Sequence, residues 1–421
     1  MLTLRSALVI PLFTTLLLHA QPTPCVPPPS ATLSVVLRAQ DTSQWCWAAS
    51  TQMILAYLKK YVGQCIQANN EFRRQDCCNT PIPEPCIRPG WPEFEKYGFR
   101  AARTSATALS WKDLTFQIGC RKTPVAFSWA WIGGGGHMMV AYGYDIAGGS
   151  RNVYIYDPLP VDIGTDQHIP YENYVSGLDH GHWDDFYDLQ SVAGATLSLA
   201  VSATPPTPAG KPLTPQQAPT LPLAKAVAPA RVAEARKVAE KQIRTFTGFE
   251  SLALAPGASL EEPYPEYFIR LDHLAAYTAG RDPSKLLSGG TRLVFPYRSV
   301  AATSLARDQS SIVVEESQGK WRYVSTNHAI AAAVLAVRTR FAVSSPPGSP
   351  TSLTPPPLSV FAVHLLGLNR YYIGRTAGSS FFLRALEKNM QPAAEERPAG
   401  DVLLELAPLA KSVNTNAPAG Y

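Results

Sequence analysis

The stretch Gln40-Asp-Thr-Ser-Gln-Trp-Cys-Trp-Ala-Ala-Ser50 decides how the first half of this chain is interpreted. It places a thiol, Cys46, at the start of a segment with a broad apolar face that runs to Tyr61 without proline or glycine, which predicts a helix. Three polar residues just upstream are candidate N-caps: Asp41, Thr42 and Ser43. A helix that begins at Cys46 directs backbone N–H groups at the sulfur and favours its thiolate form.

Two later segments supply the groups that a cysteine nucleophile needs. Four glycines, 133–136, precede His137 and an apolar run, and Asp157 ends the run Asn152-Val-Tyr-Ile-Tyr-Asp157. A nucleophile, a base and a carboxylate that orients the base are the parts of acyl transfer by a cysteine enzyme. The glycines leave room for a substrate to approach His137 closely.

The order of the expected elements gives the fold class. Helices are expected over 46–61 and 110–118, and strands over 124–131, 138–142 and 152–156. A helical part followed by a sheet part predicts an α+β domain.

Each of the three residues also has a plain structural interpretation. Cys46 is alternatively half of a disulfide, His137 alternatively ends a strand, and Asp157-Pro158 alternatively opens a turn. The joint pattern, and no single residue, favours the catalytic interpretation.

The cysteines favour an oxidising compartment. All seven lie in the first 120 residues, at Cys25, Cys46, Cys65, Cys77, Cys78, Cys86 and Cys120. An odd number leaves one thiol unpaired, which we expect to be Cys46, and the other six allow 15 pairings that the sequence does not decide. The alternative is a zinc site made of Cys65, Cys77, Cys78 and Cys86, but the spacing contains no Cys-x-x-Cys pair.

The N-terminus predicts export. Residues 1–20 combine one arginine, a mostly apolar stretch from Ala7 to Leu18 and a small residue, Ala20, as in a cleaved signal peptide. We therefore expect a secreted protein, extracellular or periplasmic, with no stable membrane insertion. The net charge of +5, from 37 basic and 32 acidic residues, is too mild and too scattered to indicate nucleic-acid binding.

Composition divides the chain. A Pro/Ala-rich linker is expected over 204–230, a second α+β domain of unknown function over 231–390 and a flexible tail over 391–421. In the second domain the patterns predict helices over 230–243 and 327–340, a hairpin around Gln318-Gly319, and strands over 361–366 and 371–374. Its histidines, His273, His328 and His364, are expected to be packed or on the surface.

Residues 32–200 resemble the papain-like cysteine peptidases. The resemblance rests on Trp45-Cys-Trp-Ala-Ala49, on Gly136-His137 before an apolar strand, and on Tyr154-Ile-Tyr-Asp-Pro158. The nearest subgroup contains bacterial secreted effector peptidases and bacteriocin-leader-processing peptidases. The resemblance implies a Cys46–His137–Asp157 triad, and an oxyanion-hole role for Gln40, six residues before Cys46, in preference to Gln44.

We therefore expect a secreted cysteine endopeptidase that acts on a polypeptide substrate and needs no cofactor or metal. A transglutaminase-like acyltransferase and an inactive binding protein with a peptidase fold are the alternatives. Papain-type enzymes often carry an N-terminal prosegment, and only about 19 residues separate the expected signal cut from Gln40. The second domain is expected either to take over the inhibitory role of a prosegment or to anchor the enzyme to a target.

Overall fold

A computed structural model describes residues 25–192, 227–245, 259–288, 292–298, 309–326, 329–343, 360–377, 380–386 and 390–416. The predicted signal peptide, most of the predicted linker and His328 lie outside these ranges. Within the described ranges, no helix is both long enough and apolar enough to cross a bilayer.

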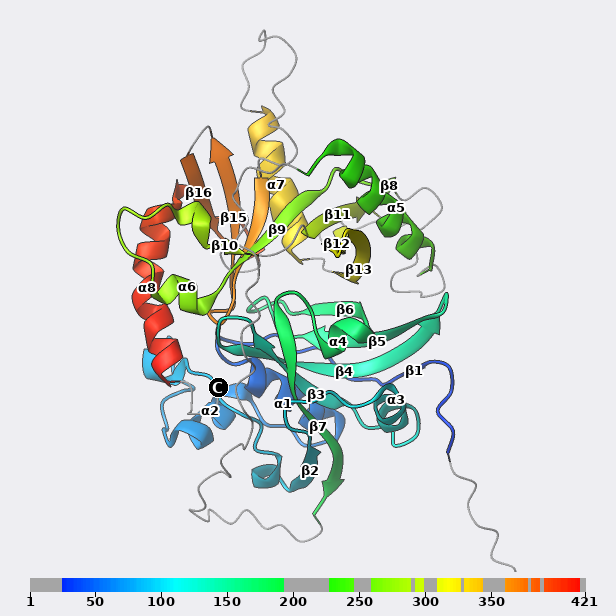
Figure 1. Cartoon of the computed structure of the whole chain (residues 1–421). Coiled ribbons are helices and arrows are strands. Elements are labelled where there is room, and N and C mark those ends of the chain that lie inside the picture. The colour runs from blue at the N-terminus through cyan, green and yellow to red at the C-terminus, as the bar shows by residue number, and fades with distance from the viewer. Residues whose placement is uncertain are drawn as a thin grey trace, which may run out of the picture.

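The first half, drawn blue to green in Figure 1, places its helices before most of its strands. Its helices are α1 (Cys46–Tyr57), α2 (Gln64–Phe72), α3 (Trp111–Gly119) and α4 (Tyr171–Val175), with short 3-10 turns η1 (Glu84–Cys86) and η2 (Phe94–Tyr97). Its strands are β1 (Ala31–Thr32), β2 (Phe99–Arg103), β3 (Val125–Trp131), β4 (Gly136–Ala147), β5 (Ser150–Asp157), β6 (Thr165–Pro170) and β7 (His180–Ser191).

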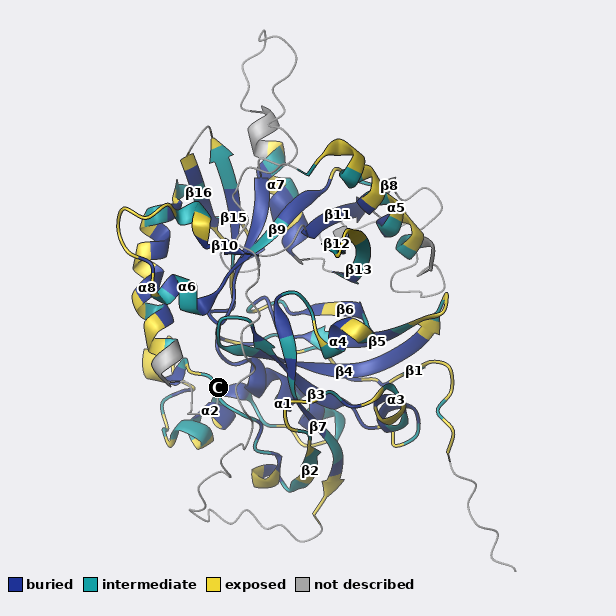
Figure 2. Ribbon diagram, viewed as in Figure 1, coloured by how far each residue is buried: buried dark blue, intermediate teal, exposed yellow. Residues whose placement is uncertain are grey.

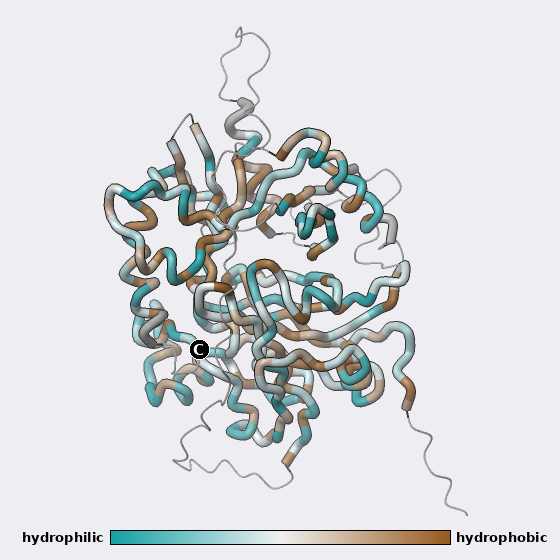
Figure 3. The backbone as a smooth tube through the Cα atoms, viewed as in Figure 1, coloured by the Kyte–Doolittle hydropathy of each residue, from teal (hydrophilic) through white to brown (hydrophobic). Residues whose placement is uncertain are grey.

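These strands form one antiparallel sheet in the order β2-β7-β3-β4-β5-β6, with β1 paired to β4. Helix α1 packs against β4, so that fully buried Met53 and Ile54 join Met139 and Val140 in one core. Strands β3, β4 and β5 are mostly buried, as the dark blue of β4 in Figure 2 shows, and Figure 3 shows both apolar and polar residues along the sheet. Burial of this apolar surface is the main stabilising contribution to the fold.

The second half builds a larger sheet. Its helices are α5 (Pro229–Thr245), α6 (Leu271–Ala275), α7 (Ala329–Val343) and α8 (Ala399–Asn416), with the 3-10 turn η3 (Pro283–Leu286). Its strands are β8 (Ser259–Leu260), β9 (Tyr264–Ile269), β10 (Leu287–Ser288), β11 (Arg292–Arg298), β12 (Gln309–Ser317), β13 (Lys320–Thr326), β14 (Val360–Leu365), β15 (Arg370–Ala377), β16 (Ser380–Ala385) and β17 (Arg397–Pro398). The order is β13-β12-β11-β9-β14-β15-β16-β17, and β9 and β14 run parallel.

The two halves contact each other where β13 lies against β6, the edge strands of the two sheets (Figure 1). The Thr326 hydroxyl accepts a hydrogen bond from the His168 backbone N–H at 3.1 Å. Arg292 forms a buried ion pair with Asp179 of the first half, at 3.0 Å between Nη1 and Oδ2. Removal of one partner of such a pair leaves an uncompensated buried charge, so this contact ties the halves together.

The predicted α+β class is confirmed, with small shifts at element ends. Helix α1 ends at Tyr57, four residues before the predicted Tyr61, because Lys59 takes a left-handed conformation (φ 65°). The N-cap position is Trp45, and no side chain caps it, so none of the three predicted caps serves there. Ser110 caps α3 by accepting a hydrogen bond from the Asp113 N–H.

The prediction of a flexible tail over 391–421 is wrong for Ala399–Asn416, which form α8. The helix buries six residues against α6 and its neighbours: Ala399, Val402, Leu403, Leu406, Ala407 and Ala410. Their spacing gives one apolar helical stripe, which overrides the Ala/Pro/Glu-rich composition around it. In Figure 1, α8 is the red helix that runs along the side of both halves and ends near α2.

Candidate active site

Cys46 is the first residue of α1 and the one free cysteine in the chain. The other six form the disulfides Cys25–Cys120, Cys65–Cys78 and Cys77–Cys86. The sulfur therefore lies where the first N–H groups of a helix have no partner within the helix and carry a partial positive charge. All four cysteines of the alternative zinc site form disulfides, so none of them is available as a zinc ligand.

The register of the sheet brings His137 and Asp157 together. Val140 of β4 pairs with Tyr156 of β5, so Asp157 lies beside Met139, one diagonal step from His137 on the same face. His137 Nε2 lies 2.6 Å from Asp157 Oδ1. Both residues are buried, with exposed fractions of 3% and 7%.

Neighbouring groups hold the Asp157 carboxylate in place. Oδ1 also accepts a hydrogen bond from the Leu159 N–H at 2.8 Å, and Oδ2 accepts one from Gln167 Nε2 at 3.2 Å. A carboxylate fixed in this way orients the imidazole ring that it bonds.

The other ring nitrogen of His137, Nδ1, is buried and makes no hydrogen bond of normal length and angle. Cys46 nevertheless lines the same cavity, and its hydrogen bond and charge influence the pKa of His137. Burial alone would lower the pKa of His137, but the charge and hydrogen bond of Asp157, followed by the hydrogen bond and charge of Cys46, raise this pKa to about 10. The ring is thus protonated at neutral pH and can act as a general acid.

A hydrogen bond connects the helix of the nucleophile to the strand of the base. Ser50, one turn into α1 and fully buried, donates its hydroxyl to the Met138 carbonyl at 3.1 Å. Trp131 lies beside the His137 ring at 6.1 Å between centroids, nearly parallel to it.

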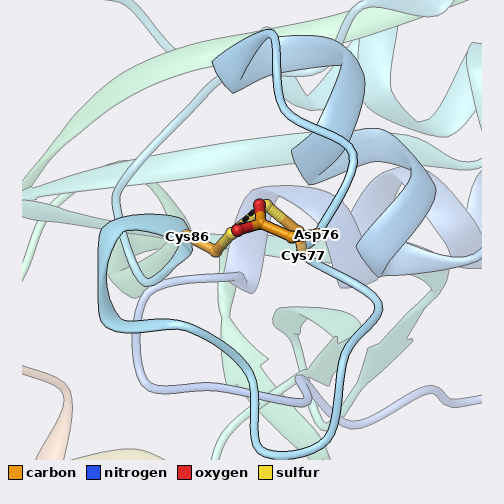
Figure 4. A group of neighbouring side chains, drawn as sticks. All are labelled: Asp76, Cys77 and Cys86. Carbon is orange, nitrogen blue, oxygen red and sulfur yellow. Dashed lines mark hydrogen bonds between the residues drawn. A yellow bond between two sulfur atoms is a disulfide. The ribbon is translucent and has the colours of Figure 1, made fainter.

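The Cys77–Cys86 disulfide supports one wall of the cavity. Figure 4 shows the carboxylate of Asp76 against this bridge. The carbonyl of Cys86 accepts a hydrogen bond from the Trp45 indole at 2.8 Å, next to the nucleophile. The chain continues to Gly90, where a side chain would meet the Trp47 ring at 2.7 Å, so only glycine fits against this aromatic wall.

The structure does not bring Gln40 to the cavity. Gln40 is fully buried, and its amide nitrogen donates to the Thr42 carbonyl at 2.6 Å. Gln44, the nearer glutamine, lines the cavity with Cys46. Gln44 lies two residues before the start of α1, and its place at the cavity could not be seen from the residue spacing to Cys46.

The cavity also contains residues that the sequence did not indicate. Gly367 and Val413, from the second half, line it together with Cys46 and His137. No motif marks them, because their role depends on how the two halves pack.

Comparison with known proteins gives a family match for part of the first half. Residues 29–168 match the family described as papain-like cysteine protease AvrRpt2. The first half is similar to papain-like cysteine proteases. The matched range is a third of the chain and contains Cys46, His137 and Asp157. No curated protein matches the chain, and no solved structure does.

The family match supports peptidase function, which places a polypeptide in the role of substrate. It extends to residue 168 and includes nothing of the second half.

Proposed function

We propose that this protein is a secreted cysteine endopeptidase that hydrolyses peptide bonds through Cys46, His137 and Asp157. The observation that carries the proposal is the environment of the buried His137 ring. Its Nε2 lies 2.6 Å from Asp157 Oδ1, and the one free thiol in the chain, that of Cys46, influences the pKa of the ring. The likeness to bacteriocin-leader-processing peptidases stays a prediction.

The proposed reaction begins with attack of the Cys46 sulfur on the peptide carbonyl carbon, which moves an electron pair to the oxygen. N–H groups at the start of α1 and the Gln44 amide stabilise this oxyanion. When the C–N bond breaks, the His137 imidazolium gives its proton to the leaving amine, and the acyl group stays on sulfur as a thioester. Water then attacks while His137 takes its proton, and the carboxylic product leaves as the C–S bond breaks.

Three disulfides in the first half support the proposal of export, because such bonds persist in oxidising compartments. The signal peptide predicted over residues 1–20 lies outside the described residues and stays a prediction.

Cleavage of a peptide library by the wild-type protein and by Cys46→Ala and His137→Ala tests this function. We expect cleavage to fall by about 10⁴-fold or more in the first variant, since the nucleophile is gone. Circular dichroism confirms that each variant is folded. Full cleavage by Cys46→Ala would refute the proposal.

The same assay decides between hydrolysis and acyl transfer. A primary amine is added, and products are identified by mass spectrometry. Carboxylic products in the presence of the amine support a hydrolase, whereas amide products alone would show the transferase alternative. If Cys46 reacts with no peptide electrophile in any variant, the result would support the alternative of an inactive binding protein with a peptidase fold.

A further inference from the structure

The second half of the chain reaches the candidate active site at two points. The first is the turn Leu366–Asn369, which joins β14 to β15, and the second is Val413 near the end of α8. Gly367 of the turn and Val413 line the same cavity as Cys46. Figure 1 shows α8 passing from the second half down to the first.

The turn holds the segment immediately before the nucleophile. The Gly367 carbonyl accepts a hydrogen bond from Gln44 Nε2 at 3.2 Å, and Asn369 Nδ2 donates to the Ser43 carbonyl at 3.2 Å. Ser43 and Gln44 lead into the first turn of α1. The amide proposed for the oxyanion is thus already engaged by the second half.

The turn also lies against the glycines that precede His137. A side-chain carbon on Gly135 would lie 2.7 Å from the Gly367 Cα, so the two backbones are in contact. The Asp272 N–H donates to the Gly133 carbonyl at 3.0 Å. The room that Gly133 and Gly135 were expected to leave for a substrate is therefore occupied by the second half.

The remaining space is small. The cavity that touches Cys46 and His137 holds about 60 Å³, whereas sites that take small molecules typically hold about 300–1,000 Å³. Cys46 itself is 8% exposed. An extended peptide needs more room than this to place its carbonyl carbon on the sulfur.

The turn is anchored on both sides. Leu366 is fully buried in the core of the first half, together with Phe268 of β9, whereas Leu368 is buried in the core of the second half. The turn is therefore a fixed part of the packed interface between the halves.

We propose that the second half inhibits the enzyme in cis: the turn Leu366–Asn369 and Val413 cover Cys46, and a polypeptide reaches the sulfur only when they move away. This inference rests on the proposed function and assigns the regulation of the same site. The hydrogen bonds of the turn go to one carbonyl and one amide of the catalytic half, so their loss shifts the balance toward the open form.

The test compares two thiol reagents of different size on the full chain. Iodoacetamide is small, and a tetrapeptide chloromethyl ketone is bulky. Because the other six cysteines are in disulfides, Cys46 is the reactive site, and mass spectrometry locates the label. We expect the wild-type protein to react with iodoacetamide but only slowly with the peptide reagent.

The variant Asn369→Gly removes the hydrogen bond to Ser43 and tolerates the left-handed conformation at this position (φ 52°). We expect the rate of labelling by the peptide reagent to rise about two- to tenfold, the factor that one hydrogen bond contributes to an equilibrium. The rate with iodoacetamide should stay unchanged. Gln318→Gly is the matched control, since Gln318 is also left-handed (φ 50°) but lies in the β12–β13 turn.

Val413→Ala tests the second point of contact on a different element, and we expect it to speed up labelling by the peptide reagent as well. Circular dichroism shows which variants are folded. Equal rates of peptide labelling in wild type and in the folded variants would overturn the proposal. Slower labelling in the variants would also overturn it, because the turn would then be part of the substrate site.

These outcomes are separable from failure of the proposed function. If Asn369→Gly accelerates labelling by the peptide reagent but cleaves no peptide from the library, the second half covers Cys46 and the peptidase assignment fails. If peptides are cleaved by both proteins at one rate, the peptidase assignment stands and the inhibition fails.

Discussion

The hydroxyl of Ser50 donates to the backbone carbonyl of Met138 at 3.1 Å, which fixes the helix of Cys46 to the strand of His137. The two residues lie 88 positions apart in the chain. Since His137 is the next residue before Met138, a small movement of this contact changes the distance between sulfur and ring.

Ser50→Ala should therefore lower activity more than its effect on stability explains. We expect the free energy of unfolding to fall by about 1 kcal/mol for the lost hydrogen bond, and kcat to fall by about tenfold or more because the catalytic groups are no longer held in register. The matched control is Thr51→Ala, which removes a buried hydrogen bond to the Trp47 carbonyl within α1 itself. Equal kcat in the two variants would contradict the positioning role of Ser50.

The pKa of His137 sets an alkaline limit to activity. This pKa is raised from 6.5 to about 10, so the charged ring is favoured in the folded protein. Its contribution to stability is fully present below pH 6.5 and is lost as the pH rises through about 10. We expect kcat/KM to fall over the same alkaline range, because the proton for the leaving amine is gone.

Asp157→Asn should move that limit to lower pH, since the Asp157 charge and hydrogen bond are the leading causes that raise the pKa of His137. We expect kcat to fall by about 100-fold as the ring loses its orientation. Asp145→Asn, a buried aspartate that accepts a hydrogen bond from Asn152, serves as the control. An alkaline limit at the same pH in Asp157→Asn and wild type would exclude this role.

The two glutamines before Cys46 should have different effects when they are replaced. Gln44→Ala removes an amide from the cavity, and we expect kcat to fall by about 10²- to 10³-fold, as for a lost oxyanion donor. Gln40→Ala removes the hydrogen bond to the Thr42 carbonyl, and we expect a loss of about 1–2 kcal/mol of stability with kcat nearly kept. Steady-state kinetics and thermal unfolding measure both. The reverse result would return the oxyanion role to Gln40, as the resemblance first implied.

The Cys77–Cys86 bridge should contribute to both stability and activity. Replacement of both cysteines by alanine is expected to cost about 2–5 kcal/mol. It should also lower kcat, because the Cys86 carbonyl holds Trp45 beside the nucleophile. Replacement of Cys25 and Cys120 removes a bridge between the chain start and the end of α3, and we expect a stability loss there without a loss of kcat. If kcat, measured well below the unfolding temperatures, is equal in the two proteins, the Cys77–Cys86 bridge does not support the active site.

The sequence predicted several elements of each half, because their patterns are local. The helix from Cys46, the helix after Ser110 and the hairpin at Gln318-Gly319 depend on residues within one or two turns of the chain. The pairing of His137 with Asp157 could also be foreseen, since strands joined by a short Gly-rich turn pair as neighbours.

Other features depend on contacts between distant segments. The position of Gln44 relative to Gln40 depends on where α1 begins and on a hydrogen bond to Gly367, 323 residues away. Helix α8 has an ordinary apolar stripe, but the composition around it resembles a disordered tail. The disulfide pairing stayed open because six cysteines pair by proximity in space, which the spacing in the chain does not determine.

The central claim is that Cys46 forms a covalent acyl intermediate with the help of His137. Acid quenching of Asn369→Gly during turnover of a peptide substrate, followed by mass spectrometry, measures this directly. The account predicts that the fragment containing Cys46 gains the mass of the acyl half of the peptide. The double variant Asn369→Gly, His137→Ala should show no such gain. Peptide cleavage without any adduct on Cys46, at a rate that Cys46→Ala leaves unchanged, would contradict it.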